Sequence, residues 1–181
     1  MNPKFKVMAN PISLNNVSFD YLKGSSDFVN HIIHNISSCV LLLDKDMMLQ
    51  AFNYPLKTIF SNKPDEDLLY QRCGEALGCA YSVEEQLDCG STSKCNSCEL
   101  RETALLSYLE KKNIYKKQIS REFYRTDTMK ELKHLQFSTR FFTFNRESYI
   151  ILIIDDITAF KTQQDVIANQ MEIIENLTEI G

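Results

Sequence analysis

Five of the six cysteines in this chain of 181 residues fall within one stretch, residues 73–98. A rare residue type that gathers this densely usually shares a chemical task. Thiolates bind zinc and iron–sulfur clusters, and pairs of thiols can also form disulfides. The stretch is therefore predicted either to hold a metal or a cluster, or to be cross-linked.

The cysteines follow the spacing C-x5-C-x9-C-x5-C-x2-C. The last pair, Cys95 and Cys98, lets two thiolates reach one ion from a single turn, and the longer intervals allow the chain to fold back. Cys79 and Cys89 each neighbour a glycine and bracket a loop that can close on that pair. We predict Cys79, Cys89, Cys95 and Cys98 as the ligands, with Cys73 as a further candidate.

Four thiolates suit a [4Fe–4S] cluster and a tetrahedral zinc ion equally well, and we favour the cluster as the expected cofactor. A cluster that is sensitive to oxygen or nitric oxide could serve as a sensor, whereas zinc would act as a structural clasp. A thiol–disulfide switch or an oxidoreductase that uses Cys95 and Cys98 is a further alternative. Cys39 lies in an apolar run and is expected to be a core residue.

Composition restricts the possible partners and location. The net charge is −4 and the isoelectric point is about 5.4, which argues against a nucleic-acid-binding module. No apolar run approaches the roughly 20 residues that a membrane helix needs, and the first residues lack the apolar centre of a signal peptide. We therefore expect a cytoplasmic protein without a membrane contact. In a reducing compartment, clustered cysteines favour metal binding over structural disulfides.

Hydrophobic periodicity predicts an α+β fold with most elements placed on either side of the cysteine stretch. Helical spacing extends over residues 25–36 and 99–112 and continues from residue 158 to the end of the chain. The apolar positions of the last helix recur every three or four residues, which indicates a coiled coil. Strand patterns occupy the remaining apolar segments: 39–44, 47–53, 114–125, 132–145 and 148–155. The last of these runs is predicted to be a central strand covered on both faces.

This order resembles that of a PAS domain over residues 25–158. The local sequence Asp156-Ile157-Thr158, directly after the last predicted strand, is similar to the motif that closes many PAS domains and opens their signalling helix. The resemblance implies a five-stranded antiparallel sheet with helices on one face and a long C-terminal helix. The cysteine stretch also looks like that of cysteine-rich bacterial PAS sensor modules, and this likeness points to the same four ligands.

The resemblance also implies a domain organisation and a function. Residues 1–24 would form an N-terminal segment, residues 25–158 the sensor domain, and residues 159–181 a helix for signalling and dimerisation. The chain would be a non-enzymatic sensor that relays redox or gas state through Asp156, Ile157 and Thr158. Its expected partners are a second copy of the chain and an output kinase, phosphatase or cyclase. The alternative is a dimerisation and ligand-binding module with a purely structural zinc site.

Overall fold

The computed structural model describes residues 26–61 and 63–179 of the chain, so the expected N-terminal segment 1–24 lies outside the described residues. The cysteine stretch lies between the second and third strands. The elements in chain order are α1 (Ser26–Asn35), β1 (Cys39–Leu43), β2 (Leu49–Phe52), α2 (Pro55–Ile59), α3 (Asp65–Leu68), α4 (Cys73–Ala76), α5 (Ala80–Glu85), the 3-10 helix η1 (Cys95–Ser97), α6 (Glu99–Leu109), β3 (Ile114–Tyr124), β4 (Lys130–Phe144), β5 (Glu147–Asp156) and α7 (Thr158–Glu179).

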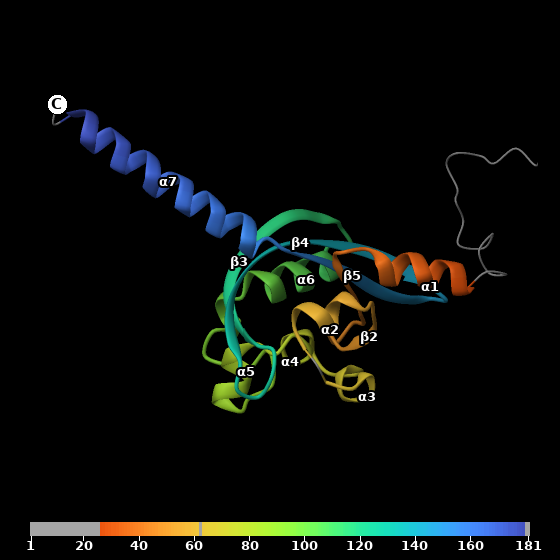
Figure 1. Cartoon of the computed structure of the whole chain (residues 1–181). Helices are drawn as coiled ribbons and strands as arrows, with labels where there is room; N and C mark the ends of the chain where they lie inside the picture. The colour runs from red at the N-terminus through yellow and green to blue at the C-terminus, as the bar shows by residue number, and fades with distance from the viewer. Residues whose placement is uncertain (1–25, 62, 180–181) are drawn as a thin grey trace, which may run out of the picture.

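The five strands form one antiparallel sheet in the order β2-β1-β5-β4-β3. The first strand therefore pairs with the last, which brings the two halves of the chain together in the middle of the sheet. Helices α2 to α6 lie on one side of the sheet (Figure 1), where α6 packs against β3, β4 and β5. This architecture confirms the predicted PAS-like α+β fold, including the five strands and the long C-terminal helix.

Alternation along the central strands defines the core. Every second side chain of β1 and β5 points toward the helices and is fully buried, and each such burial contributes roughly 1.5–3 kcal/mol to folding. The intervening Ile151 and Ile153 are only half-buried, so β5 is covered completely on one face only. The prediction that this strand is covered on both faces is therefore wrong. The fully buried residues of these two strands are Cys39, Leu41, Leu43, Ile150, Leu152 and Ile154.

The cysteine stretch is more regular than the loop that we expected. Helices α4 and α5 and the 3-10 helix η1 occupy much of it, and Cys98 then caps the start of α6. An aromatic contact on the helical side lies close by, with the rings of Phe60 and Phe123 5.3 Å apart in a T-shaped arrangement. The stretch thus forms part of the layer that covers β3.

Helix α7 projects away from the sheet (Figure 1). Its 22 residues span about 33 Å. The helix begins at Thr158, one residue before the segment 159–181 that was predicted as the signalling helix. Phe160, Ile167 and Met171 are between 51% and 59% exposed, so the apolar seam of this helix has no cover within the described part of the chain. No helix in residues 26–61 and 63–179 is long and apolar enough to cross a membrane.

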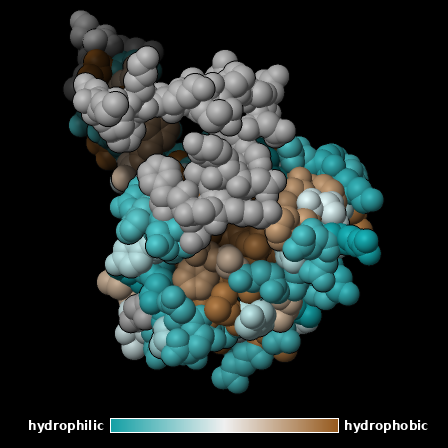
Figure 2. All heavy atoms as spheres, turned by 90° about the vertical axis from the view of Figure 1, so that its right-hand side faces the viewer, coloured by the Kyte–Doolittle hydropathy of each residue, from teal (hydrophilic) through white to brown (hydrophobic). Residues whose placement is uncertain are grey.

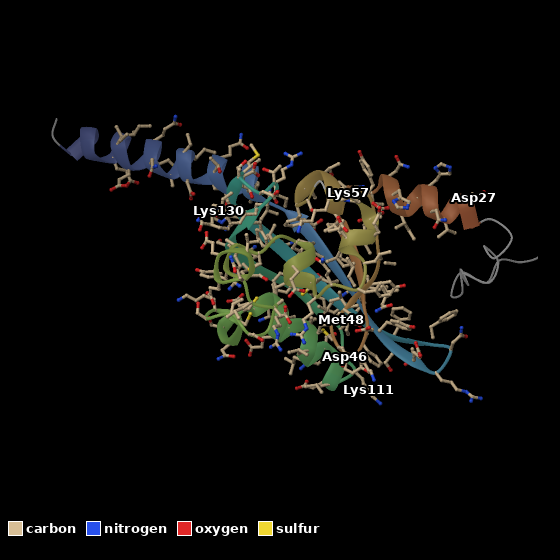
Figure 3. The ribbon with its side chains drawn as sticks, turned by 90° about the horizontal axis from the view of Figure 1, so that it is seen from below. Asp27, Asp46, Met48, Lys57, Lys111 and Lys130 are labelled. Carbon is tan, nitrogen blue, oxygen red and sulfur yellow. The ribbon has the colours of Figure 1, made fainter. Side chains whose placement is uncertain are left out.

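The surface of the domain carries exposed apolar side chains and ion pairs. Apolar side chains gather near the middle of the face seen in Figure 2, with hydrophilic residues around them. Ile32 on α1 and Ile36, directly after that helix, are 50% and 41% exposed. Figure 3 labels Lys57 and Lys130, whose ammonium groups pair with carboxylates: Lys57 with Asp65 at 2.7 Å, and Lys130 with Glu84 at 3.0 Å. The second pair ties α5 to the start of β4.

Candidate metal centre

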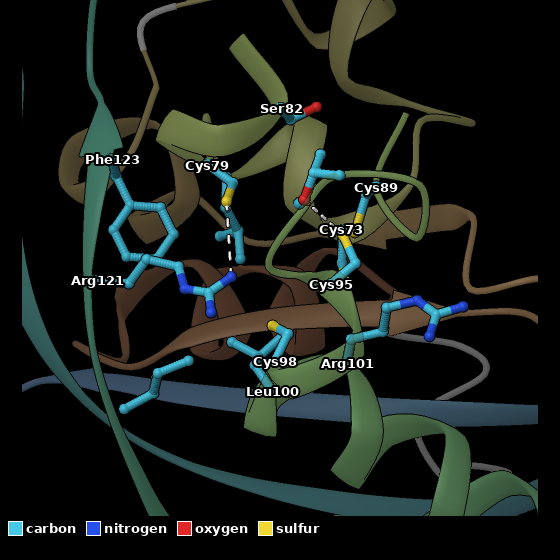
Figure 4. Close-up of a pocket in the computed structure, with 14 residues that line it drawn as sticks. Cys73, Cys79, Ser82, Cys89, Cys95, Cys98, Leu100, Arg101, Arg121 and Phe123 are labelled. Carbon is cyan, nitrogen blue, oxygen red and sulfur yellow. Dashed lines mark hydrogen bonds between the residues drawn. The ribbon is translucent and has the colours of Figure 1, made fainter. Parts of the chain in front are cut away.

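All five cysteines of the stretch line one cavity of about 20 Å³. Figure 4 shows Cys79 beside Arg121 of β3 and Cys98 at the start of α6, with the remaining three cysteines gathered on another side of the cavity. The wall is completed by apolar side chains of α4, α6 and β3: Leu77, Leu100, Ile119 and Phe123. Cys39 lies apart from the cavity in β1, where burial raises its pKa, so it is a core residue as predicted.

Four of these cysteines stand where a helix begins. Cys73 opens α4, Cys79 caps α5, Cys95 opens η1 and Cys98 caps α6. The first backbone N–H groups of a helix have no partner within the helix and carry partial positive charge. Such N–H groups can donate hydrogen bonds to a sulfur that lies at the start of the helix.

Hydrogen-bond donors reach several of the sulfurs. The backbone N–H of Gly90 donates to Cys95 Sγ at 3.0 Å, and the hydroxyl of Thr92 lies 2.9 Å from the same sulfur. Arg121 Nη1 donates to Cys79 Sγ at 3.9 Å. Backbone N–H groups also donate to the sulfurs of Cys89 and Cys98, from Gly74 and Arg101 respectively. Such donors stabilise thiolate charge and tune the properties of metal–thiolate centres.

The thiols of Cys73 and Cys89 interact directly. A hydrogen bond from Cys73 lowers the pKa of the Cys89 thiol to about 6, although burial opposes this shift. The N–H of Gly74 and the charge of Arg101 lower the pKa of Cys89 further. The same hydrogen bond, together with burial, raises the pKa of Cys73. Within this pair the pKa of Cys89 is thus lowered and the pKa of Cys73 is raised.

Gly74 and Gly78 permit two close approaches that shape the centre. A β-carbon at Gly74 would lie 2.6 Å from Cys89 Sγ, so only glycine leaves room for that sulfur. Gly78 has φ +72°, and a β-carbon there would lie 2.3 Å from the Tyr124 carbonyl oxygen. The N–H of Tyr124 donates to the Gly78 carbonyl at 2.7 Å, and Cys79 forms a β-bridge with Phe123. The turn between α4 and α5 is thus docked onto the end of β3.

Two carboxylates hold the segment that carries Cys89 and Cys95. Glu75 accepts hydrogen bonds from the N–H groups of Arg72 and Cys89, at 2.8 and 2.6 Å. Glu85 accepts from the N–H and the hydroxyl of Ser93, at 2.8 and 2.5 Å. The backbone around the sulfurs is therefore fixed by α4 and α5.

Three arginines that sequence reasoning did not single out surround the sulfurs. A β-carbon at Gly90 would lie 3.3 Å from Arg72 Nη1 and 3.2 Å from Arg101 Nη2, so both guanidinium groups border this turn. Arg121 lies on the other side and stacks over Tyr81. Burial lowers the pKa of Arg121, but the neighbouring Cys98 and Cys79 outweigh it and raise the pKa. Arg72 directly precedes Cys73, and Arg101 follows Cys98 by three residues. This closeness to a cysteine was the only sign in the sequence of a role for these two arginines.

The cavity brings together Cys79, Cys89, Cys95 and Cys98, the four predicted ligands, and also the further candidate Cys73. Within the described residues, however, no three histidine, cysteine, aspartate or glutamate side chains are already arranged to bind a metal ion. The sulfurs line a common space without converging at bonding distance. Their role as ligands therefore stays a prediction, and side-chain rotation would be needed to close a site.

The predicted relay residues lie where β5 passes into α7. Asp156 accepts from both the N–H and the hydroxyl of Thr158, at 3.0 and 2.5 Å. Thr158 Oγ1 accepts from the N–H of His134, and the N–H of Ile157 donates to the His134 carbonyl, at 2.9 and 2.8 Å. Lys133 donates to Asp156 at 3.1 Å. The start of α7 is thus joined to β4.

The sequence matches no protein-family model and no curated protein. Solved structures with the same fold include the PAS domain of an HTR-like protein from Haloarcula marismortui, at 13% identity and a TM-score of 0.50, covering 75% of this chain and 100% of that chain. A PAS domain from Colwellia psychrerythraea is 9% identical with a TM-score of 0.50, and the match covers 74% of this chain and 97% of the other.

An RNA-binding light-oxygen-voltage receptor is 12% identical with a TM-score of 0.54. That match covers 99% of this chain but only 42% of the receptor. At these identities the three similarities establish a PAS-like fold for this chain and leave its ligand and its partners to be inferred from its own residues.

Proposed function

We propose that this chain is a PAS-type sensory module whose cysteine cavity binds an iron–sulfur cluster or a metal ion. The observation that carries the proposal is that five cysteines, spread over 26 positions between 73 and 98, line a single small cavity. PAS-like folds are sensor domains in many proteins, but a fold does not determine function. The argument therefore rests on the cavity.

The donor set fits a metal–thiolate centre. Backbone and side-chain donors reach the sulfurs of Cys79, Cys89, Cys95 and Cys98. Four thiolates around zinc or a [4Fe–4S]²⁺ cluster leave a net negative charge, and three nearby guanidinium groups offset it. Such compensation lowers the electrostatic cost of gathering thiolates in a buried space.

The volume of the cavity suits a single metal ion better than an iron–sulfur cluster. About 20 Å³ is enough for one water-sized object, and a single ion is of that size. The larger [4Fe–4S] cluster, which we favour from the cysteine pattern, requires the cavity to widen. A bound cluster would supply redox and gas reactivity, whereas zinc would supply a structural clasp.

A contiguous row of residues could carry the state of the centre to α7. Arg121 contacts Cys79 and pairs across the sheet with Lys133, whose ammonium group binds Asp156. Asp156 in turn holds Thr158 at the start of α7. A change at Cys79 would alter the charge that Arg121 faces and so the anchoring of the helix. Coupling through such a row requires two alternative arrangements of the helix.

Helix α7 would deliver the signal as part of a homodimer. Its exposed apolar seam suits a parallel pairing of two copies, in which a rotation of the helices reaches an output domain or partner such as a kinase, phosphatase or cyclase. A cytoplasmic location is part of the proposal, because a reducing compartment keeps the thiols free to bind a metal.

The alternatives receive less support from the site. An oxidoreductase built on Cys95 and Cys98 needs an exposed thiolate of low pKa. Both residues are buried, and burial raises the pKa of Cys98. A dimerisation module with a structural zinc site shares the same ligands, so it is distinguished only by whether the bound metal responds to a signal.

Anaerobic purification followed by iron, zinc and acid-labile sulfide analysis tests the proposal. We expect about one zinc ion or one four-iron cluster per chain, and iron–sulfur protein would be brown. The Cys79→Ala and Cys98→Ala variants should lose the metal, and the matched control Cys39→Ala, which changes a cysteine outside the cavity, should keep it. Wild-type protein that folds yet binds neither metal after reconstitution would contradict the proposal.

A further inference from the structure

Cys73 lies against one particular member of the predicted ligand set. Both cysteines line the metal cavity, and a β-carbon on Gly74, the residue after Cys73, would lie 2.6 Å from the Cys89 sulfur. A tetrahedral site uses four sulfurs, so a fifth in the same cavity is not needed as a ligand. Its contact with Cys89 therefore calls for a second explanation.

Hydrogen bonds with two side chains next to Cys73 hold the backbone of Cys89 in place. Arg72 Nη1 donates to the Cys89 carbonyl at 2.7 Å, and the Glu75 carboxylate accepts from the Cys89 N–H at 2.6 Å. Both groups of Cys89 are therefore tied to residues that flank Cys73 in α4. Movement of the segment that carries Cys95 and Cys98 would leave this pair in place.

A second pocket gives solvent a route to the same pair. It has a volume of about 240 Å³ and is lined by the basic side chains of Lys45, Arg72 and Arg101. Of the five cysteines that line the metal cavity, only Cys73 and Cys89 also line this pocket. A small solute that enters the pocket therefore reaches the residues Cys73 and Cys89 before the other three cysteines.

We propose that Cys73 and Cys89 form a disulfide when the protein meets a hydroperoxide, and that this withdraws Cys89 from the ligand set. The disulfide itself depends only on the two cysteines and their pocket. Its effect on the metal rests on the proposed function of the cavity. The pair would make the module respond to peroxide as well as to the reactivity of its metal.

The reaction consumes one hydroperoxide for each disulfide. The Cys89 sulfur attacks the terminal oxygen of the peroxide, the S–O bond forms and the O–O bond breaks, which leaves a sulfenic acid on Cys89 and releases an alcohol or water. The Cys73 sulfur then attacks the Cys89 sulfur, and hydroxide leaves with the proton of Cys73 as water. Two thiols supply the two electrons, and a dithiol reductant would reverse the step.

Disulfide mapping of the full chain tests the proposal. Protein purified anaerobically is treated with one equivalent of hydrogen peroxide, alkylated, and digested without reduction for mass spectrometry. We expect a peptide linked between Cys73 and Cys89, and release of bound metal in step with its formation. Cys73→Ala should lose the linked peptide and keep its metal during the treatment, and Cys39→Ala should behave like wild type.

Several outcomes would overturn the proposal. These are a dominant link between Cys95 and Cys98, alkylation of Cys73 while other cysteines are oxidised, and loss of metal from untreated Cys73→Ala, which would make Cys73 a ligand. If wild-type protein holds no metal, the proposed function fails, but the mapping on metal-free protein still decides whether this disulfide forms. The Cys73→Ser variant repeats the test if Cys73→Ala does not fold, which circular dichroism would reveal.

Discussion

The side chains of Lys133 and Asp156 are joined by an ion pair of 3.1 Å that connects β4 to the end of β5, two residues before α7 begins. The two groups are largely buried, at 11% and 24% side-chain exposure, so solvent screens the pair less than a surface pair. Asp156 also accepts two hydrogen bonds from Thr158. One carboxylate thus fixes both the sheet and the helix start, which makes it a sensitive place to test the relay.

Removal of the Asp156 carboxylate should loosen α7 at its base. Although burial raises the pKa of Asp156, the hydrogen bonds from Thr158 and Lys133 outweigh it and lower the pKa. A lowered folded-state pKa adds stability above the unfolded-state value of about 4, and this stability is lost as pH falls through the folded-state value. We expect Asp156→Asn to unfold at lower urea concentration than wild type at pH 7.

The difference between Asp156→Asn and wild type should shrink as pH falls below about 4, the unfolded-state pKa. Its size at pH 7 should be about 1 kcal/mol in the free energy of unfolding. Urea titrations followed by circular dichroism measure it. Glu172→Gln, a change on the outer face of α7, serves as the control. A difference that is constant over the whole pH range would show that the carboxylate charge does not anchor the helix.

Gly78 should tolerate no side chain. Gly78→Ala would place a methyl group 2.3 Å from the Tyr124 carbonyl at a positive φ, and such a site costs about 1–3 kcal/mol. We expect a loss of that order in urea titrations, together with reduced metal content, because the turn docks the cysteine segment onto β3. Gln86→Gly is the matched control, since Gln86 also has a positive φ of 55° but is exposed, and it should be neutral or stabilising.

The guanidinium group of Arg121 should increase the affinity of the cysteines for a metal ion. Its guanidinium group donates to Cys79 Sγ, and partners of metal ligands typically change affinity by about 10–100-fold when removed. Arg121→Gln is therefore expected to raise the zinc dissociation constant by about tenfold or more in competition with a chelator. Arg121→Lys keeps the charge and should lose less. Equal affinities in wild type and Arg121→Gln would mean that the arginine does not act on the sulfurs.

The α7 seam should determine the oligomeric state. Ile167→Glu places a charge among the exposed apolar residues and should convert a dimer to a monomer in analytical ultracentrifugation. Asn169→Glu introduces the same charge two residues later, about 200° around the helix and so on its opposite side, and should leave the dimer intact. If both variants are monomeric, or if both are dimeric, the dimer interface does not lie on the apolar seam of α7.

The sequence alone determined the sheet and the identity of the cysteines. Alternation in 132–145 and the apolar run at 148–155 predicted β4 and β5 within two residues at each end, because one face of each strand must be apolar to form the core. The spacing of five cysteines predicted that they would act together. Their approach to a single cavity agrees with that prediction, whereas metal binding itself remains to be measured.

Only the tertiary structure decided what surrounds the sulfurs. Helices α4 and α5 are four and six residues long, too short for a hydrophobic period to appear in the sequence. Arg72, Arg101 and Arg121 come from three separate segments, and only the docking of Gly78 on Tyr124 brings β3 to the cysteines. The proximity of Cys73 and Cys89 likewise depends on the hydrogen bonds of Cys89 with Arg72 and Glu75, which span 17 and 14 positions and which no local pattern encodes.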